Sequence, residues 1–254
     1  MALSETSNYR AIAAQIRADI KDGRYPRGSE LPLQAEMAQH YGTAQSTVSK
    51  ALKVLATAGI IQPIRGKRTI VTPIPPIHRN PSLRYSKAAR ERAGARGAYD
   101  AEVRALGMTP RSDKTIRSAV PPEDVAEILG VDAESESTIV HARVMWADET
   151  ITQLADSYLP KDLAEGTVLE QIDTGAGGMI SRMAELGFAQ VEITESIQGR
   201  PATPEEARAL QISEDQHVYV VTHVGRTAEG RAVEATIHTM PQHLWILETT
   251  FTID

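Results

Sequence analysis

The chain of 254 residues contains no cysteine. This absence excludes a disulfide framework, a thiolate zinc site, an iron–sulfur cluster and a cysteine nucleophile, and it fits a reducing compartment. The sequence also lacks an apolar run of about 18 residues and an apolar segment near its start, so neither a membrane span nor a signal peptide is expected. We therefore expect a cytoplasmic protein with no membrane partner.

Glycine and proline are not enriched either, with 17 and 14 residues. Their ordinary number excludes a collagen-like or low-complexity chain. The chain has 41% hydrophobic and 24% charged residues, which is the composition of a globular protein. Its length favours about two domains of ~100 to 200 residues each.

The net charge of −6 conceals an uneven distribution. Residues 1–99 carry 16 Lys and Arg against 6 Asp and Glu, whereas the remaining residues carry 11 against 27. A basic segment joined to an acidic body indicates a module that binds a polyanion, attached to a domain with another task. Chance clustering of surface charge is the alternative.

A proline-rich segment separates the two parts. The residues TPIPPIHRNP (72–81) include four prolines, which remove backbone donors and block a regular helix. We therefore expect a linker at 73–83 between a first domain at 1–72 and a second at 84–254.

The first domain has the pattern of a winged helix-turn-helix. Apolar residues at helical spacing, each set followed by a glycine, predict helices at about 8–22, 34–41 and 44–58. Short strands are expected at 60–64 and 69–71, and the tip between them is the basic run Arg65, Gly66, Lys67 and Arg68.

The third helix is expected to bind duplex DNA. The short side chains of Ser46 and Ser49 let a helix approach base edges in the major groove, while Lys50 and Lys53 reach phosphates. Gln45 can donate and accept on the edge of an adenine. A helical domain with a solvated basic face is the alternative. The predicted DNA-binding residues are Gln45, Ser46, Thr47, Ser49, Lys50, Lys53, Arg65, Gly66, Lys67 and Arg68.

The acidic part contains a divergent repeat with an offset of 81 residues. Short helices at 121–129 and 203–210 each precede a hairpin that ends in a proline, Pro160 or Pro241. Alternating apolar positions predict half-buried antiparallel strands. A helix at 178–186 and a strand at 188–197 lie between the copies, so we expect an α+β domain with a mostly antiparallel sheet.

Polar side chains share one face of these strands. Alternation places His141 and Arg143 on one side, and it places Glu234, Thr236 and His238 together on a later strand. The guanidinium of Arg143 can bind a carboxylate or phosphate at two points, and Glu234 can accept from a hydroxyl or amine. A salt bridge between Arg143 and Glu234, or a solvated sheet face, is the alternative.

Further candidates come from the repeat and from a basic loop. The offset places Glu234 at the position equivalent to Gln153. The loop ARERAGARGAYDAEV (89–103) either closes over a pocket or extends the linker, and it supplies Arg96, Gly97 and Tyr99. The predicted effector-binding residues are His141, Arg143, Gln153, Glu234, Thr236, His238 and Tyr99.

Residues 9–71 resemble the DNA-binding domain of GntR-type bacterial transcription regulators; they run from YRAIAAQIRADIKDGRYPRGSELP to RTIV. Residues that match the family pattern include Tyr9, Gly42, Val48 and Gly59. The remainder, through Phe251, is similar to the effector-binding UTRA domain of the HutC subfamily, whose hairpins end in strands like SYLP and HTMP here. The resemblance implies a chorismate-lyase-like fold. It also implies a homodimer on a two-fold operator in double-stranded DNA, with basic groups from the first hairpin and a glutamate from the last contacting a small-molecule ligand.

The chain departs from the family pattern at several of these positions. Ala44 and Gln45 stand where Ser-Arg is usual, Ser49 stands where a second arginine is usual, and Arg68 replaces a wing glycine. His141 stands where another arginine is often found. The operator sequence therefore does not follow from the resemblance, and neither does a sugar phosphate as the ligand.

Motifs of catalysis are missing. The sequence has no P-loop, no G-x-S-x-G and no H-E-x-x-H, and its seven histidines lack metal-ligand spacing. We expect no catalytic residue, no metal and no cofactor, and a repressor that a small polar or anionic effector releases from DNA. The alternatives are a repressor with a vestigial pocket and an enzyme, because the implied fold is shared with a lyase.

Overall fold

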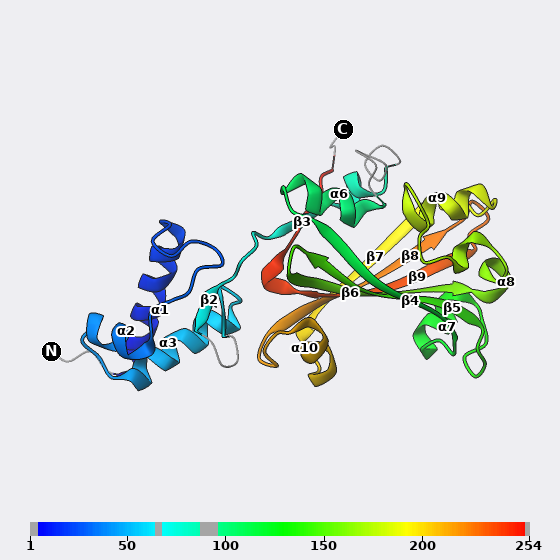
Figure 1. Cartoon of the computed structure of the whole chain (residues 1–254). Helices are drawn as coiled ribbons and strands as arrows, with labels where there is room; N and C mark the ends of the chain where they lie inside the picture. The colour runs from blue at the N-terminus through cyan, green and yellow to red at the C-terminus, as the bar shows by residue number, and fades with distance from the viewer. Residues whose placement is uncertain (1–4, 64–67, 87–95, 252–254) are drawn as a thin grey trace. The chain divides into compact units, whose positions relative to one another are not determined.

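The chain forms two compact units in a computed structural model that describes residues 5–63, 68–86 and 96–251. Unit 1 comprises Met1–Pro76, Pro201–Gln216 and Gln242–Leu244, and unit 2 comprises Ile77–Arg200, His217–Pro241 and Trp245–Asp254. Figure 1 labels the elements. In the described ranges, no helix is long and apolar enough to cross a membrane.

Unit 1 contains the expected three helices and hairpin. The elements are α1 (Glu5–Lys21), α2 (Gln34–His40), α3 (Gln45–Thr57), β1 (Ile61–Pro63) and β2 (Thr69–Val71). The two strands are antiparallel. Gly42 makes the turn from α2 to α3 with φ of 59°, a left-handed conformation that glycine adopts without steric cost.

One apolar core holds these elements together. Ile16, Val48 and Leu55 are fully buried, and they pack with Met37 and Ile61 from the neighbouring elements. The helix α10 (Pro204–Leu210) and the turn η3 (Gln242–Leu244) also belong to unit 1. The side-chain amide of Gln216 donates to the carbonyl oxygen of Ala56 at the end of α3, at 2.7 Å.

Unit 2 is built on one six-stranded sheet. Its strand order is β4-β5-β6-β9-β8-β7, and the pairs β4–β5, β5–β6, β6–β9 and β8–β9 are antiparallel. The strands are β4 (Pro110–Ala119), β5 (Thr138–Ala147), β6 (Thr150–Pro160), β7 (Glu192–Pro201), β8 (His217–Arg226) and β9 (Ala232–Pro241). The expected α+β fold with a mostly antiparallel sheet is confirmed.

The two hairpins of the repeat meet in the middle of this sheet. They are β5–β6 and β8–β9, they end at Pro160 and Pro241 as expected, and Ser157 on β6 faces Thr236 on β9. Figure 1 shows α7 (Glu123–Leu129) and α9 (Gly178–Glu185) on opposite sides of the sheet. Apolar side chains of α7 pack against β8 and β9, whereas α9 packs against the opposite face.

Several elements lie where the sequence did not predict them. The strand β3 (Ile77–Arg79) falls within the expected linker, and the turn of helix α4 (Pro81–Arg84) begins there and ends one residue beyond it. β3 pairs in parallel with β10 (Trp245–Leu247). Ile77 and Arg79 are almost fully buried, so this part of the segment is folded into unit 2. The helix α6 (Ala98–Ala105) occupies part of the expected loop.

Candidate DNA-binding face and ligand cavity

The exposed side of α3 carries the short and basic side chains that were expected to face DNA. Gln45, Ser46, Ser49, Lys50 and Lys53 are all exposed. Val48, Ala51, Leu52 and Leu55 on the opposite side are buried in the core, because residues three or four apart share a helix face. This arrangement leaves a polar ridge with little side-chain bulk near the start of α3.

Thr47 was predicted to bind DNA with these residues, but it does not lie on the exposed side of α3. Its side chain is 9% exposed, because Thr47 lies one turn before Ala51 and two turns before Leu55 on the face that enters the core. Thr47 therefore does not belong to the exposed ridge, and its contribution is to the packing of α3.

Two of the cations near this ridge take part in exposed ion pairs. The Nζ atom of Lys53 lies 3.1 Å from a carboxylate oxygen of Asp215, and the Nε atom of Arg68 lies 3.6 Å from one of Glu30. Such pairs contribute little to stability and exchange readily with other anions. The remaining hairpin-tip candidates, Arg65, Gly66 and Lys67, lie outside the described residues.

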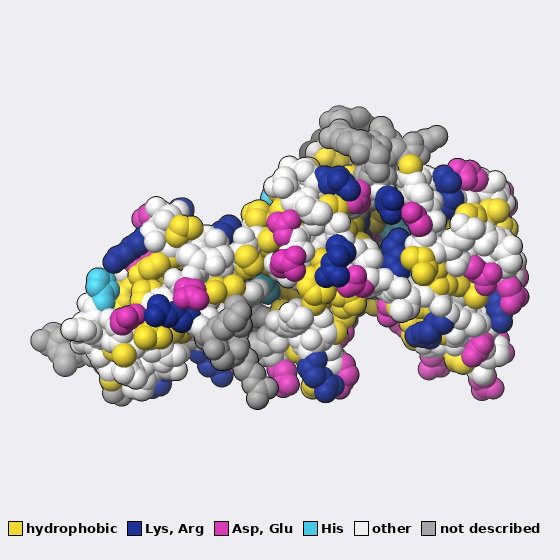
Figure 2. Space-filling view, in the orientation of Figure 1, with side chains coloured by type: hydrophobic (Ala, Val, Ile, Leu, Met, Phe, Trp, Pro, Cys, Tyr) yellow, Lys and Arg dark blue, Asp and Glu magenta, His cyan; other side chains and the backbone are white. Residues whose placement is uncertain are grey.

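Unit 2 contains a cavity of about 450 Å³. Figure 2 shows Lys and Arg side chains bordering a hollow in this unit. All seven residues predicted to bind an effector line the cavity, namely His141, Arg143, Gln153, Glu234, Thr236, His238 and Tyr99. Arg96 and Gly97 line it as well. The structure thus brings side chains from β5, β6, β9 and α6 around one space.

Arg143 and Glu234 are connected through a third side chain. The guanidinium of Arg143 donates to the hydroxyl of Ser157, and that hydroxyl lies 3.2 Å from a carboxylate oxygen of Glu234. Arg143 also donates to the carbonyl oxygen of Ala155, at 3.4 Å. The direct salt bridge considered as an alternative is therefore not formed between these two described residues.

Glu234 is held as a buried anion. Burial alone would raise the pKa of its carboxyl group, but the charge of His223 and hydrogen bonds from Gln190 and Thr236 lower it. Both hydrogen bonds measure 2.8 Å. Glu234 can therefore accept a further hydrogen bond from a hydroxyl or an amine of a ligand.

The two predicted histidines are neutral. Burial lowers the pKa of His141 to about 4, and its Nε2 atom donates to the carbonyl oxygen of Leu169 at 2.6 Å. Burial also lowers the pKa of His238 far below its usual value. The Nδ1 atom of His238 is buried and has no hydrogen-bond partner among the described residues.

Gln153 and Tyr99 occupy another part of the wall. The side-chain amide of Gln153 donates to the sulfur of Met145, and the hydroxyl of Tyr99 lies 2.6 Å from that of Thr152. Gln153 and Glu234 hold equivalent positions in the repeat, but they do not face each other across β6 and β9. In the antiparallel register Ser157 faces Thr236 and Leu154 faces Thr239, so Gln153 and Glu234 lie several residues apart along the strands.

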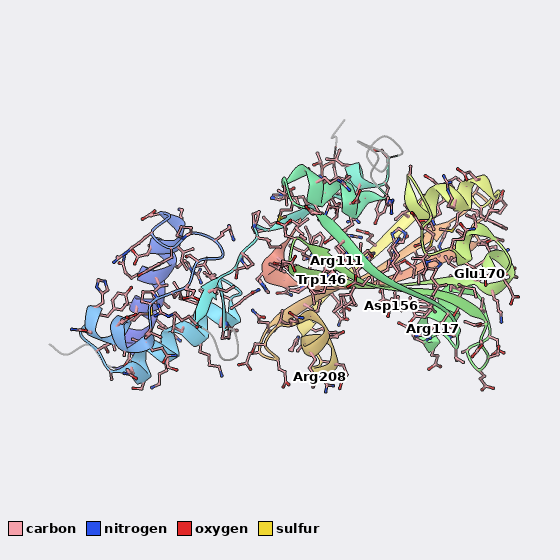
Figure 3. All side chains as sticks on the ribbon, in the orientation of Figure 1. Arg111, Arg117, Trp146, Asp156, Glu170 and Arg208 are labelled. Atoms are coloured by element: carbon pink, nitrogen blue, oxygen red, sulfur yellow. The ribbon has the colours of Figure 1, made fainter. Side chains whose placement is uncertain are left out.

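Several lining residues were missed by sequence reasoning. They include Lys114 and Arg111 on β4 and Tyr85 and His223. Ser112, Lys114 and Ile116 alternate with more exposed residues along β4 in the structure, but the sequence PRSDKTIRSA has no apolar alternation that would predict this strand. In Figure 3, Arg111 and Trp146 lie next to each other, and the guanidinium of Arg111 is 4.1 Å from the centre of the indole ring.

Two family models match the chain, one after the other along the sequence. The family model described as "Bacterial regulatory proteins, gntR family" matches residues 8–71, and the model described as "UTRA domain" matches residues 88–243. An HTH-type transcriptional regulator of Streptomyces coelicolor is 28% identical over 235 residues, which are 90% of this chain and 87% of that protein. The HTH-type transcriptional repressor NagR of Bacillus subtilis is 24% identical over 228 residues, with 89% and 87% covered.

A solved structure has the same fold. The crystal structure of PhnF from Mycobacterium smegmatis matches with a TM-score of 0.59 and 20% identity, and the match covers 95% of this chain and 99% of that one.

Proposed function

Because the chain belongs to the GntR family of bacterial transcription regulators and carries a UTRA domain, we propose that it is a homodimeric repressor released from a two-fold operator by a small polar or anionic effector. The chain is a DNA-binding regulator by its family membership. We propose in addition that the chain forms a dimer, that it represses transcription and that an effector releases it from DNA.

The exposed ridge of α3 is the observation that supports sequence-specific DNA binding most directly. We infer that Gln45, Ser46 and Ser49 approach base edges, while Lys50, Lys53 and the hairpin tip contact phosphates. The two exposed ion pairs of Lys53 and Arg68 can exchange their carboxylates for phosphates on binding.

The cavity of unit 2 supports the effector part of the proposal. Its volume of about 450 Å³ lies in the range of small-molecule sites. Arg143 offers a cation and Glu234 an acceptor, so the ligand that fits carries an anionic or strongly polar group together with a hydroxyl or amine. An effector that prefers the conformation with low operator affinity lowers that affinity by the ratio of its own affinities for the two states.

Selection of bound sites from random duplex DNA tests the DNA-binding part. The expected result is an inverted repeat bound by two chains, with the stoichiometry measured by light scattering of the complex. Selected sites without two-fold symmetry, or one chain per site, would contradict the dimer.

A metabolite screen tests the effector part and separates it from the alternatives. The expected result is a compound that raises the thermal midpoint of the protein, releases the selected operator and remains chemically unchanged after incubation. A stabilising compound that leaves the operator bound indicates a vestigial pocket, and one that is converted to product indicates an enzyme.

A further inference from the structure

Two short segments from far along the sequence contact the end of α3 within unit 1. They are residues 213–216, which follow α10, and residues 242–244, which form η3. Their contacts fall on Lys53, Ala56 and Gly59. Lys53 and Ala56 are three residues apart and share one side of α3, and Gly59 lies in the turn that follows the helix. We call these two segments the clamp.

The first contact of the clamp closes the C-terminal end of α3. The last carbonyl groups of a helix have no partner within the helix, and the last turn of α3 has no basic residue to supply a donor. The buried amide of Gln216 donates to the carbonyl oxygen of Ala56 at 2.7 Å. The amide oxygen of Gln216 accepts from the backbone N–H of Ser213 at 3.2 Å, so the side chain is held in this orientation.

The second contact depends on a glycine. Gly59 has φ of 67°, and a Cβ atom at this position would lie 1.9 Å from the Cγ atom of His243. The imidazole therefore lies directly against the backbone of Gly59, closer than a residue with a side chain would allow. Burial lowers the pKa of His243 to about 4, so the ring packs there as a neutral group.

The third contact engages a cation of the DNA-binding ridge, because the Nζ atom of Lys53 lies 3.1 Å from a carboxylate oxygen of Asp215. Residues 201–216 carry four acidic residues and one arginine, whereas residues 1–76 carry ten Lys and Arg against five Asp and Glu. The phosphates of DNA repel a segment of negative charge. The clamp thus brings an acidic segment of the chain to the helix that is expected to bind DNA.

The clamp is continuous with two strands that line the ligand cavity. Gln216 directly precedes β8, Gln242 directly follows β9, and Val218 faces Pro241 where the two strands pair. His223 on β8 and Glu234 on β9 line the cavity. A displacement at this end of the β8–β9 hairpin therefore reaches the clamp through the backbone.

We propose that the clamp is an autoinhibitory contact, which holds α3 in a state of low affinity for DNA and opens when the operator binds. The proposal rests on the DNA-binding role of α3 given above, and it requires neither the dimer nor the effector. A protein whose binding-competent state is only partly populated binds with an affinity reduced by that fraction. Opening the clamp by substitution should therefore tighten operator binding, whereas loss of a DNA contact weakens it.

Asp215→Asn tests the clamp at its exposed end. The substitution removes the partner of Lys53, and the full-length variant should bind the selected operator about three- to fivefold more tightly than the parent. Binding is measured by fluorescence anisotropy at fixed salt without effector. Glu214→Gln is the matched control, because it removes the same charge from the neighbouring exposed position and leaves the Lys53 pair in place. The control should stay within about twofold of the parent.

Gly59→Ala tests the clamp at its buried end. Gly59 and Gly23 both have a left-handed backbone, with φ of 67° and 80°, so alanine is disfavoured at both. The added Cβ atom would overlap His243 at Gly59, whereas nothing lies within 4 Å of it at Gly23. Gly59→Ala should bind the operator about tenfold more tightly than the parent, and Gly23→Ala should not. Thermal midpoints of both variants show whether they share the same loss of stability.

The double variant Gly59→Ala with Asp215→Asn separates an open clamp from a change of charge. Once the clamp is open, Asp215 no longer pairs with Lys53, so the double variant should bind about as tightly as Gly59→Ala alone. Gains that add would show that Asp215 acts through its charge, and they would overturn the proposal.

The proposal also fails if neither Asp215→Asn nor Gly59→Ala binds the operator more tightly than the parent. In that case operator binding by the parent in the same titrations leaves the DNA-binding regulator intact, and only the clamp is lost. A parent that selects no operator overturns both the clamp and the DNA-binding role of α3.

Discussion

The carboxylate of Glu195 on β7 forms a buried ion pair with the guanidinium of Arg79 on β3, and 6% and 1% of the two side chains are exposed. The hydroxyl of Tyr85 donates to the same carboxylate oxygen. Burial alone would raise the pKa of Glu195, but its contacts with His223, Arg79 and Tyr85 lower it. This pair ties the first strand of unit 2 to the edge of the large sheet.

Loss of this pair should destabilise unit 2 strongly. Glu195→Gln leaves the charge of Arg79 buried without compensation, and we expect a loss of about 3 to 5 kcal/mol in the free energy of unfolding, measured by urea denaturation. The double variant Glu195→Leu with Arg79→Met removes both charges and should lose less. A single variant within about 1 kcal/mol of the parent would show that the pair is not needed.

The hairpin tip should control the salt dependence of DNA binding. Lys67→Ala removes one cation from a basic run, so it should weaken binding to all sequences. It should also reduce the slope of log affinity against log salt by about one per contacted phosphate, or about two in a dimer. Binding is measured over a salt series, with Lys161→Ala in unit 2 as the control. An unchanged slope removes the tip from the DNA interface.

Gln45 should read a base. If its exposed amide binds adenine, Gln45→Ala costs about 1 to 3 kcal/mol on the selected operator and relaxes the preference at one position in each half-site. The measurement is competition binding with operators changed one base pair at a time. Thr57→Ala, an exposed position at the other end of α3, is the control. An equal loss on every sequence would make Gln45 a positioning residue.

Arg143 should be needed for the response to effector and not for DNA binding. We expect Arg143→Ala to bind the operator as tightly as the parent but to remain bound when the screened effector is added, because the ligand loses a cation on the cavity wall. The thermal midpoint is measured on the same samples. A normal response places the ligand elsewhere, whereas early melting with lost DNA binding makes Arg143 a structural residue.

His141 should make the stability depend on pH. Its folded-state pKa of about 4 lies below the usual 6.5, so the unfolded chain binds more protons between these values and stability falls as the pH drops through that range. The contribution, fully present above pH 6.5, should decrease by about 2 kcal/mol between pH 7 and pH 5. His141→Gln should flatten this part of the stability curve, and His40→Gln on the exposed side of α2 should not.

The elements that could be predicted from the sequence have a local period. The helices of unit 1 repeat their buried residues at helical spacing, and β5 and β9 alternate, which was enough to group Arg143 with His141 and Glu234 with His238. Thr47 was predicted to contact DNA, but it lies on the buried face of α3. Its place in the helical period puts it in the core.

The parts that could not be predicted depend on distant partners or carry no apolar period. β3 and β10 are three-residue strands that pair across more than half of the chain, and nothing local marks either of them. β4 is an edge strand rich in polar residues, so Lys114 had no predicted element to place it. Gln190 lies just before β7, and only the folded sheet brings its amide to Glu234.

The antiparallel pairing of β6 with β9 gives the cavity a direction. The first hairpin of the repeat contributes the cation Arg143 and the second contributes the carboxylate Glu234, and both side chains meet at the hydroxyl of Ser157. Two opposite charges therefore lie side by side in the cavity wall, joined by one hydroxyl group. A ligand that carries an anionic group next to a hydroxyl or amine satisfies both side chains in one orientation, whereas two groups of the same kind satisfy only one of them. The cavity would thus select the proposed effector by the order of its polar groups as well as by its size.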